Sequence, residues 1–356
     1  MKVTQHCRPR LLLTLAALLI AFFHGPAKAS AQNGAKNAIP LIFETDMGND
    51  VDDVLALDML YKLVDQGRVH LLGISTNKDN PYSILLLRIM NNWYGYPGIP
   101  LGKVQNGINS TADAKDYAQA VYDYQRNGEY VFRKYLGDSS RIMESVALYR
   151  KLLSAQPDAS VSIVSVGFST NIARLLDSKP DSYSRLTGSE LVKKKVKKLY
   201  MMAGNFNGKL QAGEYNVIKD SLAAKKVFDE WPTPIVTSPF EVGITVLFPA
   251  ASIENDLRLA ADHPLRVAYE SYLPMPYDRP CWDPTAMWYA VTADSGYFSI
   301  SQPGRISVGQ RARTSFTAQP DGPHRYLMVD SIQSAKIRDR FIQLVRTRPA
   351  RFNSSK

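Results

Sequence analysis

Short apolar runs alternate with segments of helical periodicity along this chain, and that alternation constrains the fold more than any other feature. Each apolar run is short enough for one buried strand, and the segments between runs repeat apolar residues every three or four positions. This order indicates a mostly parallel sheet with helices on both faces, which is an α/β fold. The predicted strands cover residues 39–43, 69–75, 161–166, 198–202 and 234–237, and the predicted helices cover 54–64, 83–94 and a segment from about 171.

Nothing in the pattern marks a linker between two cores, so we expect a single domain over residues 39–356, less regular after about residue 295. In sheets of parallel strands the functional site lies at the carboxyl ends of the strands. Polar residues follow the predicted strands at 46–53, 76–80, 169–171 and 205–216. We therefore expect the site to be built from these segments.

The loop after the first predicted strand, residues 44–53, is strongly acidic and contains Asp46, Asp50, Asp52 and Asp53. Close carboxylates repel by about 1 kcal/mol per pair in water and by about 4 kcal/mol at an effective dielectric constant of 20. A bound cation relieves this repulsion, and oxygen ligands without a nearby His or Cys favour Ca²⁺ or Mg²⁺ over zinc. The spacing is not that of an EF-hand. The alternative, that Asp52 and Asp53 only cap a helix, leaves the other two acids without a role.

The segment Asp46-Met-Gly48-Asn-Asp50-Val-Asp52-Asp53 resembles the aspartate-rich amino-terminal signature of the inosine-uridine-preferring nucleoside hydrolase family. The usual family signature is shorter by two residues. Asp46 matches its first aspartate and Asp52-Asp53 its adjacent pair, because the apolar helix that follows aligns in that register. Asp50 falls in the insertion, so its role is open.

Further segments resemble the same family in the same order along the chain, and all of them lie at predicted strand ends or in loops. They are residues 73–80 with Asn80, 166–171 with Thr170, 202–216 with Glu214 and Asn216, and the segment Trp282-Asp283-Pro284. The resemblance implies an open, Rossmann-like nucleoside hydrolase architecture. It also implies hydrolysis of an N-ribosidic bond, which gives ribose and a free base.

The resemblance assigns roles to the residues of the site. Asp46 is implied as the catalytic base that takes a proton from the attacking water. The implied calcium ligands are Asp46, Asp52, Asp53, Asp283 and the carbonyl oxygen of Thr170. The implied substrate contacts are Asn80, Met202, Glu214, Asn216, Trp282 and Asp52. Carboxylates beneath the sugar ring would stabilise the oxocarbenium-like transition state of glycoside cleavage. Each asparagine has an alternative interpretation as a turn or capping residue.

One residue departs from the family pattern. Trp282 stands where the best-known members have a histidine, which is credited with protonating the departing base. Either another group donates this proton, or aromatic stacking and solvent activate the leaving group. Trp282 fits stacking on a purine-like ring, and it equally fits packing as an ordinary buried tryptophan. The rival hypothesis is therefore a non-catalytic, calcium-dependent ribose- or nucleoside-binding protein.

Three other function classes fit the sequence less well. The segment Gly167-Phe-Ser169-Thr-Asn171 lacks the closing glycine of a nucleophile elbow, which argues against a serine hydrolase. Gly48 replaces the second aspartate of phosphatases that use an aspartate nucleophile. The lysines within residues 193–198 lead into a predicted strand without interleaved aromatic residues, which favours a solvated strand entry over a nucleic-acid groove. We expect a small ribonucleoside-like substrate and no nucleic-acid partner.

The amino terminus has the order of a secretory signal, with basic residues, an apolar run at 11–23 and a small-residue ending at Ala29. Cleavage after Ala29, or after Ala31, would lower the formal charge of +10 by four and remove Cys7, leaving Cys281 without a disulfide partner. We expect a signal peptide over residues 1–29, a tether over 30–38, and an exported product that is periplasmic or secreted. After signal removal no apolar run is long enough to span a membrane, whereas a retained anchor is the alternative. The resemblance implies a homo-oligomer.

Overall fold

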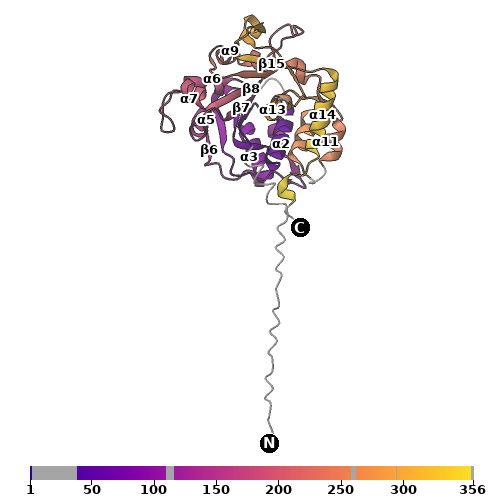
Figure 1. Cartoon of the computed structure of the whole chain (residues 1–356). Helices are drawn as coiled ribbons and strands as arrows, with labels where there is room; N and C mark the ends of the chain where they lie inside the picture. Colours follow the sequence, from indigo (N-terminus) through magenta and orange to yellow (C-terminus); the bar gives the residue numbers. More distant parts are fainter. Residues whose placement is uncertain (2–37, 110–115, 258–261, 294, 354–356) are drawn as a thin grey trace.

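The structure is a computed structural model of the whole chain, and it describes residues 1, 38–109, 116–257, 262–293 and 295–353. The predicted signal peptide and tether lie outside these ranges, except for their first and last residues. One large sheet runs through the middle of the folded part, with helices on both sides of it (Figure 1). The predicted α/β fold with a mostly parallel sheet is confirmed.

The strands of the central sheet are β1 (Ile39–Thr45), β2 (Val69–Lys78), β3 (Leu101–Ile108), β6 (Ile142–Glu144), β7 (Val161–Val166), β8 (Val196–Met202), β9 (Ile235–Ser238), β12 (Ser299–Ile300), β13 (Gly304–Val308), β14 (Thr314–Ala318) and β15 (His324–Met328). Their order is β14-β13-β15-β9-β8-β7-β1-β2-β3-β6, with β12 paired to β15. Pairing is parallel from β15 through to β6, whereas β12, β13 and β14 run antiparallel to their neighbours. Two short pairs lie outside the central sheet, β4 (Gln125–Arg126) with β5 (Glu129–Tyr130) and β10 (Leu247–Phe248) with β11 (Arg279–Pro280).

The helices are α2 (Asp52–Asp65), α3 (Pro81–Trp93), α4 (Tyr117–Asp123), α5 (Ser145–Ser154), α6 (Thr170–Asp177), α7 (Gly188–Lys195), α8 (Tyr215–Lys219), α9 (Ser221–Glu230), α10 (Phe240–Gly243), α11 (Ala250–Asp256), α12 (Pro264–Tyr272), α13 (Trp282–Thr292) and α14 (Ser331–Val345). Short 3₁₀ turns occur at η1 (Arg133–Tyr135), η2 (Gln310–Ala312) and η3 (Ala350–Phe352). Within the described residues, no helix combines the length and apolar character needed to cross a bilayer.

The two faces of the central sheet carry separate hydrophobic cores, because successive residues of a strand point to opposite sides. Leu41 and Phe43 of β1 pack in the core formed with α2, α3, α13 and α14. Ile42, between them, packs in the core formed with α5, α6, α7 and α9. Both faces of the parallel strands are therefore buried, which explains why these strands are continuous apolar runs in the sequence.

The carboxyl-terminal part is more regular than predicted. Residues after 295 form β12 to β15 and α14, and these strands extend the central sheet. The expectation of a less regular segment was wrong because buried and exposed residues alternate along β13, Gly304–Val308. A strand with one exposed face lacks the continuous apolar run that marks a buried parallel strand.

Strand β1 continues to Thr45, two residues beyond the predicted strand, so Glu44 belongs to the sheet and not to the acidic loop. The Glu44 carboxylate is buried and accepts hydrogen bonds from Tyr149 Oη (2.5 Å), Ser165 Oγ (2.6 Å) and Asn171 Nδ2 (3.2 Å). Burial raises the pKa of Glu44, and these hydrogen bonds oppose the rise. The network ties β1 to β7, α5 and α6 next to the acidic loop.

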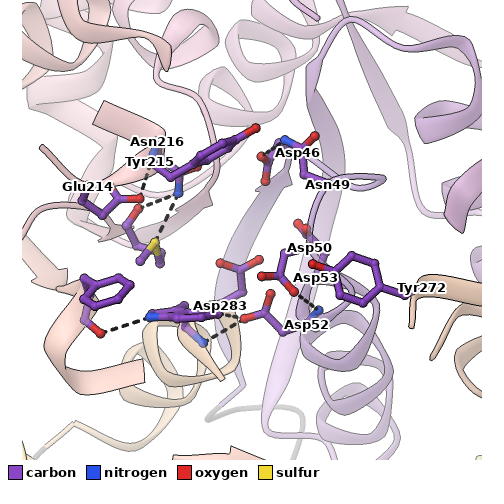
Figure 2. Close-up of a pocket in the computed structure, with 13 residues that line it drawn as sticks. Asp46, Asn49, Asp50, Asp52, Asp53, Glu214, Tyr215, Asn216, Tyr272 and Asp283 are labelled. Carbon is purple, nitrogen blue, oxygen red and sulfur yellow. Dashed lines mark hydrogen bonds between the residues drawn. The ribbon is translucent and has the colours of Figure 1, made fainter. Parts of the chain in front are cut away.

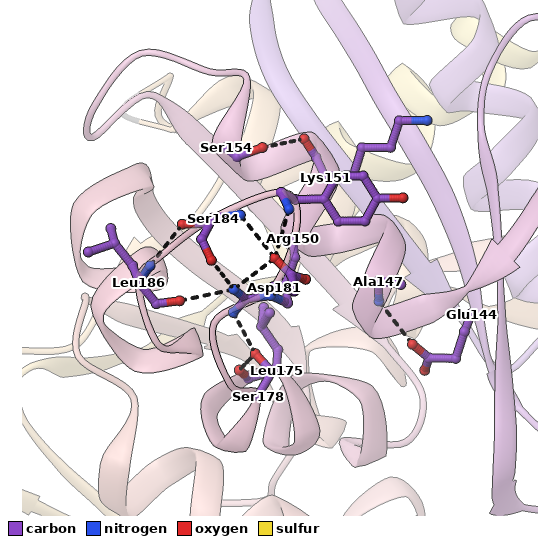
Figure 3. Close-up of polar contacts among 11 residues, drawn as sticks. Glu144, Ala147, Arg150, Lys151, Ser154, Leu175, Ser178, Asp181, Ser184 and Leu186 are labelled. Carbon is purple, nitrogen blue, oxygen red and sulfur yellow. Dashed lines mark hydrogen bonds and ion pairs between the residues drawn. The ribbon is translucent and has the colours of Figure 1, made fainter.

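A buried arginine of α5 holds the connection between α6 and α7 (Figure 3). The Arg150 guanidinium donates to both carboxylate oxygens of Asp181 (2.7 and 3.1 Å) and to Ser178 Oγ (2.9 Å). It also donates to the carbonyl oxygens of Ser184 (3.0 Å) and Leu186 (2.9 Å). Because each donor has a partner, this charge is buried without an unpaired group, and the pairing lowers the pKa of Asp181. These hydrogen bonds hold the polar loop between α6 and α7 against α5.

Candidate active site

A cavity of about 270 Å³ lies where β1 and β8 end and where α2, α8 and α13 begin. Small-molecule sites in proteins span about 300–1,000 Å³, so this cavity suits one compact ligand and not a polymer. It opens at the carboxyl ends of the parallel strands, as expected for an α/β sheet. Its lining residues are Asp46, Asn49, Asp50, Asp52, Asp53, Met202, Glu214, Tyr215, Asn216, Phe240, Tyr272, Trp282 and Asp283.

Three carboxylates form a tight group at the cavity. Asp46, Asp53 and Asp283 are all buried, and each offers an oxygen that lies within 4.8 Å of the other two. Asp53 Oδ1 accepts a hydrogen bond from the Thr45 hydroxyl, whereas Asp53 Oδ2 has no hydrogen-bond partner among the described residues. A buried carboxylate oxygen without a donor is costly, and a cation is the partner that fits three converging oxygens. Oxygen-only ligands suit a hard divalent ion such as Ca²⁺.

The electrostatics of the three carboxylates also favour a bound cation. Burial raises the pKa of Asp46 to about 6, while the hydrogen bond from Asn49 and the charge of Lys78 oppose the rise. Burial also raises the pKa values of Asp53 and Asp283 well above the usual range, and neighbouring aspartates raise them further. Without a cation the three carboxylates therefore hold protons to a higher pH than free aspartates do. A divalent ion would displace those protons.

Asp52 has a different position from its neighbour Asp53. Its Oδ2 atom accepts hydrogen bonds from the backbone N–H groups of Trp282 (2.8 Å) and Asp283 (2.9 Å), the first two residues of α13. It thus caps α13 and fixes the place of Asp283. Asp52 lines the cavity but lies outside the group of three, which consists of Asp46, Asp53 and Asp283, so the predicted ligand role of Asp52 stays a prediction.

Glu214 and Asn216 lie across the cavity from Asp50, Asp52 and Tyr272 (Figure 2). Glu214 caps α8 and accepts from the N–H groups of Asn216 (2.7 Å), Gly204 (3.2 Å) and Val217 (3.4 Å). Burial raises its pKa to about 7, and these hydrogen bonds oppose the rise.

Asn216 is held by Met202, because its Nδ2 donates to the Met202 carbonyl (3.3 Å) and contacts Sδ (3.2 Å). The structure therefore brings Met202 next to Asn216. Glu214 and Asn216 lie on the wall of the cavity opposite Asp50 and Asp52 of the acidic loop (Figure 2).

Two predicted site residues do not line the cavity. Asn80 caps α3, since its Oδ1 accepts from Tyr82 N (2.7 Å), and its Nδ2 donates to Asp116 (2.7 Å). Capping thus accounts for Oδ1, the contact with Asp116 accounts for Nδ2, and the predicted substrate role of Asn80 stays a prediction. Thr170 begins α6, and its hydroxyl donates to Asp220 Oδ2 (2.6 Å), so the predicted ligand role of its carbonyl oxygen stays a prediction.

A sequence profile described as inosine-uridine preferring nucleoside hydrolase matches residues 41–339, a span that includes every residue lining the cavity. The chain belongs to this family. It is accordingly a hydrolase that acts on N-glycosyl compounds. No match is found among curated protein sequences.

Solved structures of nucleoside hydrolases share the fold. A plant nucleoside hydrolase is 16% identical with a TM-score of 0.63, and the match covers 89% of this chain and 99% of the plant chain. The inosine-uridine preferring nucleoside hydrolase of Bacillus anthracis is 18% identical with a TM-score of 0.62 and coverages of 86% and 99%. The type III effector protein XopQ, solved with adenosine diphosphate ribose, is 14% identical with a TM-score of 0.58 and coverages of 90% and 99%.

Trp282, the departure from the usual nucleoside hydrolase pattern, lines the cavity, but its polar atom is occupied. The indole N–H donates to the Phe240 carbonyl (3.0 Å), and the two rings stack with centroids 5.6 Å apart. A side chain on Gly243 would lie 2.2 Å from the indole, so this close packing requires glycine. Trp282 therefore offers an apolar aromatic surface to the cavity, and its N–H is already used.

Asp50, in the insertion relative to the family signature, forms a bidentate ion pair with Arg279. Arg279 Nε donates to Asp50 Oδ1 (2.8 Å), and Nη2 donates to Oδ2. The guanidinium carbon of Arg279 lies over the rings of Tyr272 (5.0 Å) and Trp282 (5.3 Å). The insertion in this nucleoside hydrolase thus supports two aromatic residues of the cavity wall.

Several residues of the site were not predicted from the sequence. Tyr215, Phe240 and Tyr272 line the cavity, and Asn49 and Lys78 form a polar chain to Asp46. The aromatic residues have no local signal, because they come from separate loops and helices that only the tertiary fold brings together. Lys78 had one usable signal, a lysine that ends a largely apolar strand.

Gly167 leaves the space in which Asp46 sits. It has φ of +109°, and a Cβ there would lie 2.6 Å from Asp46 Oδ1 and 2.7 Å from Asn77 Oδ1. The glycine that follows β7 is thus required both by its backbone conformation and by the close approach of the carboxylate.

Proposed function

We propose that this protein hydrolyses the N-glycosidic bond of ribonucleosides, or of a related N-riboside, in a calcium-dependent reaction that gives ribose and free base. The observation that carries the proposal is the group of Asp46, Asp53 and Asp283 at one side of a small cavity, with Glu214 and Asn216 across from it. Membership of the nucleoside hydrolase family supports the class of reaction.

Asp46 is the proposed general base. It lines the cavity, and its carboxylate belongs to the group of three that fits Ca²⁺. Calcium, when bound, would supply a positive charge that orients sugar hydroxyls and favours ionisation of a water molecule. Asp46 would take the proton of the attacking water, and the surrounding carboxylates would stabilise positive charge that develops on the ribose ring. Asp53 and Asp283 complete the proposed ligand set, with the Thr170 carbonyl.

The leaving base is expected to bind against the aromatic side of the cavity. Phe240, Trp282 and Tyr272 supply this surface, and no histidine lies among the described lining residues. Burial raises the pKa of Tyr272 to about 12, so its hydroxyl stays protonated and can donate a hydrogen bond. We propose that stacking, solvent and such a neutral donor assist departure of the base in place of the family histidine.

A second candidate function is non-catalytic, calcium-dependent binding of a ribose or nucleoside compound. Two observations support it. Trp282 stands in place of the usual proton donor, and the XopQ structure with bound adenosine diphosphate ribose has the same fold.

Release of reducing sugar from a panel of purine and pyrimidine ribonucleosides, with adenosine diphosphate ribose included, tests these functions against each other. In excess Ca²⁺, the proposed function predicts release from at least one compound, with matching appearance of free base. Calcium-dependent binding of a panel member, measured by calorimetry, without release from any of them would favour the binding protein instead.

We further propose that the protein is exported after cleavage near Ala29 and works as a homo-oligomer, on the basis of the amino-terminal sequence and the family. Mass spectrometry of the mature chain from the source cell, and light scattering of the purified protein, test the two statements separately. An intact amino terminus would contradict the first, and a monomer the second.

The Asp50→Asn substitution tests the role of the insertion. It removes the charge that pairs with Arg279 and loosens the support of Tyr272 and Trp282. The ion pair is partly exposed, so we expect a rise in KM of about fivefold, equivalent to about 1 kcal/mol, with a smaller change in kcat. Steady-state kinetics on the best substrate measures both parameters.

Asp229→Asn, which breaks an exposed pair with Lys225 on α9, is the matched control and should leave KM unchanged. An unchanged KM in Asp50→Asn as well would show that the ion pair does not shape the substrate site.

A further inference from the structure

Lys78 is a buried lysine next to the cavity. It is the last residue of β2 and is only 3% exposed. Its Nζ donates a hydrogen bond of 2.5 Å to the side-chain oxygen of Asn49, in the acidic loop. Burying an ammonium group is unfavourable unless its partners compensate the lost hydration, so a buried lysine at this place indicates a specific role.

Asn49 connects this lysine to the proposed base. Its Nδ2 donates to Asp46 Oδ2 at 2.6 Å, while its Oδ1 accepts from Lys78. The orientation of the amide is fixed by its neighbours, because an ammonium group requires an acceptor and a carboxylate requires a donor. Asn49 is 8% exposed and lies beside Asp46 at the cavity (Figure 2).

The two carboxylate oxygens of Asp46 have different surroundings, because the hydrogen-bonded chain Lys78–Asn49–Asp46 reaches only one of them. Oδ2 is held by the Asn49 amide. Oδ1 lies on the side of Gly167, where the missing side chain leaves it room. A hydrogen-bond chain that starts from a charged donor is stronger than isolated neutral bonds, because each bond polarises the next. The carboxylate is therefore restrained in one orientation.

We propose that Lys78 is a positioning residue for Asp46, acting through the Asn49 amide to keep one carboxylate oxygen aimed at the attacking water. The proposal rests on the proposed function, since it assumes that Asp46 is the base. Asn49 directly precedes Asp50, the residue that falls in the insertion relative to the family signature. The Asn49 amide that links Lys78 to Asp46 therefore comes from the longer loop of this protein. A misplacement of a reacting group by about 1 Å can cost about a hundredfold in rate.

A double-mutant cycle with Lys78→Met and Asn49→Ala tests the proposal. Each single variant is expected to lower kcat by about tenfold to a hundredfold. KM should change little in Lys78→Met, because Lys78 does not line the cavity, whereas Asn49 does. The double variant should be no slower than the slower single variant, because both substitutions break the same chain. Losses in kcat that multiply in the double variant, or an unchanged kcat in Lys78→Met, would overturn it.

Lys62→Met is the matched control for loss of a buried lysine. Lys62 is 1% exposed, pairs with Asp58 and donates to the Val345 carbonyl, and it does not line the cavity. This variant should lose thermal stability while its folded fraction keeps the wild-type kcat. If kcat per folded molecule fell in Lys62→Met as much as in Lys78→Met, Lys78 would act only through general stability.

Two readouts separate this proposal from the proposed function. The calcium affinity of Lys78→Met, measured by calorimetry, should fall much less than that of Asp53→Asn, because the variant keeps all three clustered carboxylates; a fall as large as that of Asp53→Asn would show loss of the metal site and overturn the positioning role. In a metal-free crystal structure of Lys78→Met, the Asn49 amide should leave Asp46 Oδ2. If the wild type hydrolyses no compound, the proposed function fails, whereas an unchanged Asp46 and Asn49 in that structure refutes the positioning itself.

Discussion

Asp46→Asn is expected to lower kcat by about a thousandfold while leaving the fold intact, within the range of about 10²–10⁴ that general-base catalysis contributes. The asparagine is nearly the same size but carries no charge and cannot accept the proton of the attacking water. It also weakens calcium binding, because Asp46 is one of the three clustered carboxylates. The metal-free variant should be at least as stable as the wild type, since it removes a buried charge from a repelling group.

Steady-state kinetics in saturating calcium and thermal unfolding of the metal-free protein measure the two effects of Asp46→Asn separately. Asp256→Asn is the control, because this aspartate of α11 contacts Ser252 in the same helix and Arg346 at the end of α14, and it does not line the cavity. Its kcat should equal that of the wild type. Turnover of Asp46→Asn at the wild-type rate would remove Asp46 as the base.

The buried parallel strands could be predicted from the sequence because burial on both faces makes their residues uniformly apolar. The runs at 161–166 and 69–75 correspond to β7 and the first part of β2. Strand β3 was missed because only its first half is mostly buried, whereas its second half, Gln105-Asn-Gly-Ile108, is largely polar and at least partly exposed. The sheet order was also not predictable, because it depends on pairings between segments far apart in the chain.

The acidic part of the site was predictable because its chemistry is local. Asp46 and Asp53 stand close together in the sequence, and repulsion between them already implied a cation. Asp283 was found only through the resemblance, since it lies about 230 residues further along the chain. The partners Lys78 and Arg279 could not be predicted from spacing, because each reaches the acidic loop only through the tertiary fold.

Asp52 and Asp53 received the same ligand role from the resemblance, but the structure gives them different hydrogen-bond partners. Asp52 and Asp53 are adjacent on α2, yet Asp53 joins the carboxylate group and Asp52 caps α13. Neighbouring residues on a helix point about 100° apart, so adjacent acids can have different partners even where both line one cavity. Helix capping and metal binding both fit these two acids in the sequence, and in the structure Asp52 caps α13 while Asp53 belongs to the carboxylate group that fits a cation.

Removal of divalent metal is expected to abolish activity and to destabilise the protein more at high pH than at low pH. Folding raises the pKa of Asp46 from 3.8 to about 6 and that of Glu214 from 4.5 to about 7, in both cases mainly through burial. The metal-free folded state therefore holds protons that the unfolded chain releases, and its stability falls as the pH rises through these values. Asp46 alone accounts for about 3 kcal/mol lost between about pH 4 and pH 7.

Calcium binding reverses this loss, because the ion replaces the protons on Asp46, Asp53 and Asp283. Proton competition at Asp46 alone should make calcium affinity about tenfold higher at pH 8 than at pH 5. Thermal unfolding in chelator and in excess calcium, at both pH values, measures the effect, and the rise in Tm should be larger at pH 8. Asp53→Asn should lose most of this rise in Tm. Magnesium should raise Tm less than calcium does, because Mg²⁺ demands near-ideal octahedral geometry, whereas Ca²⁺ accepts a flexible set of oxygen ligands. An equal rise in Tm at both pH values would contradict direct binding of the ion to these carboxylates.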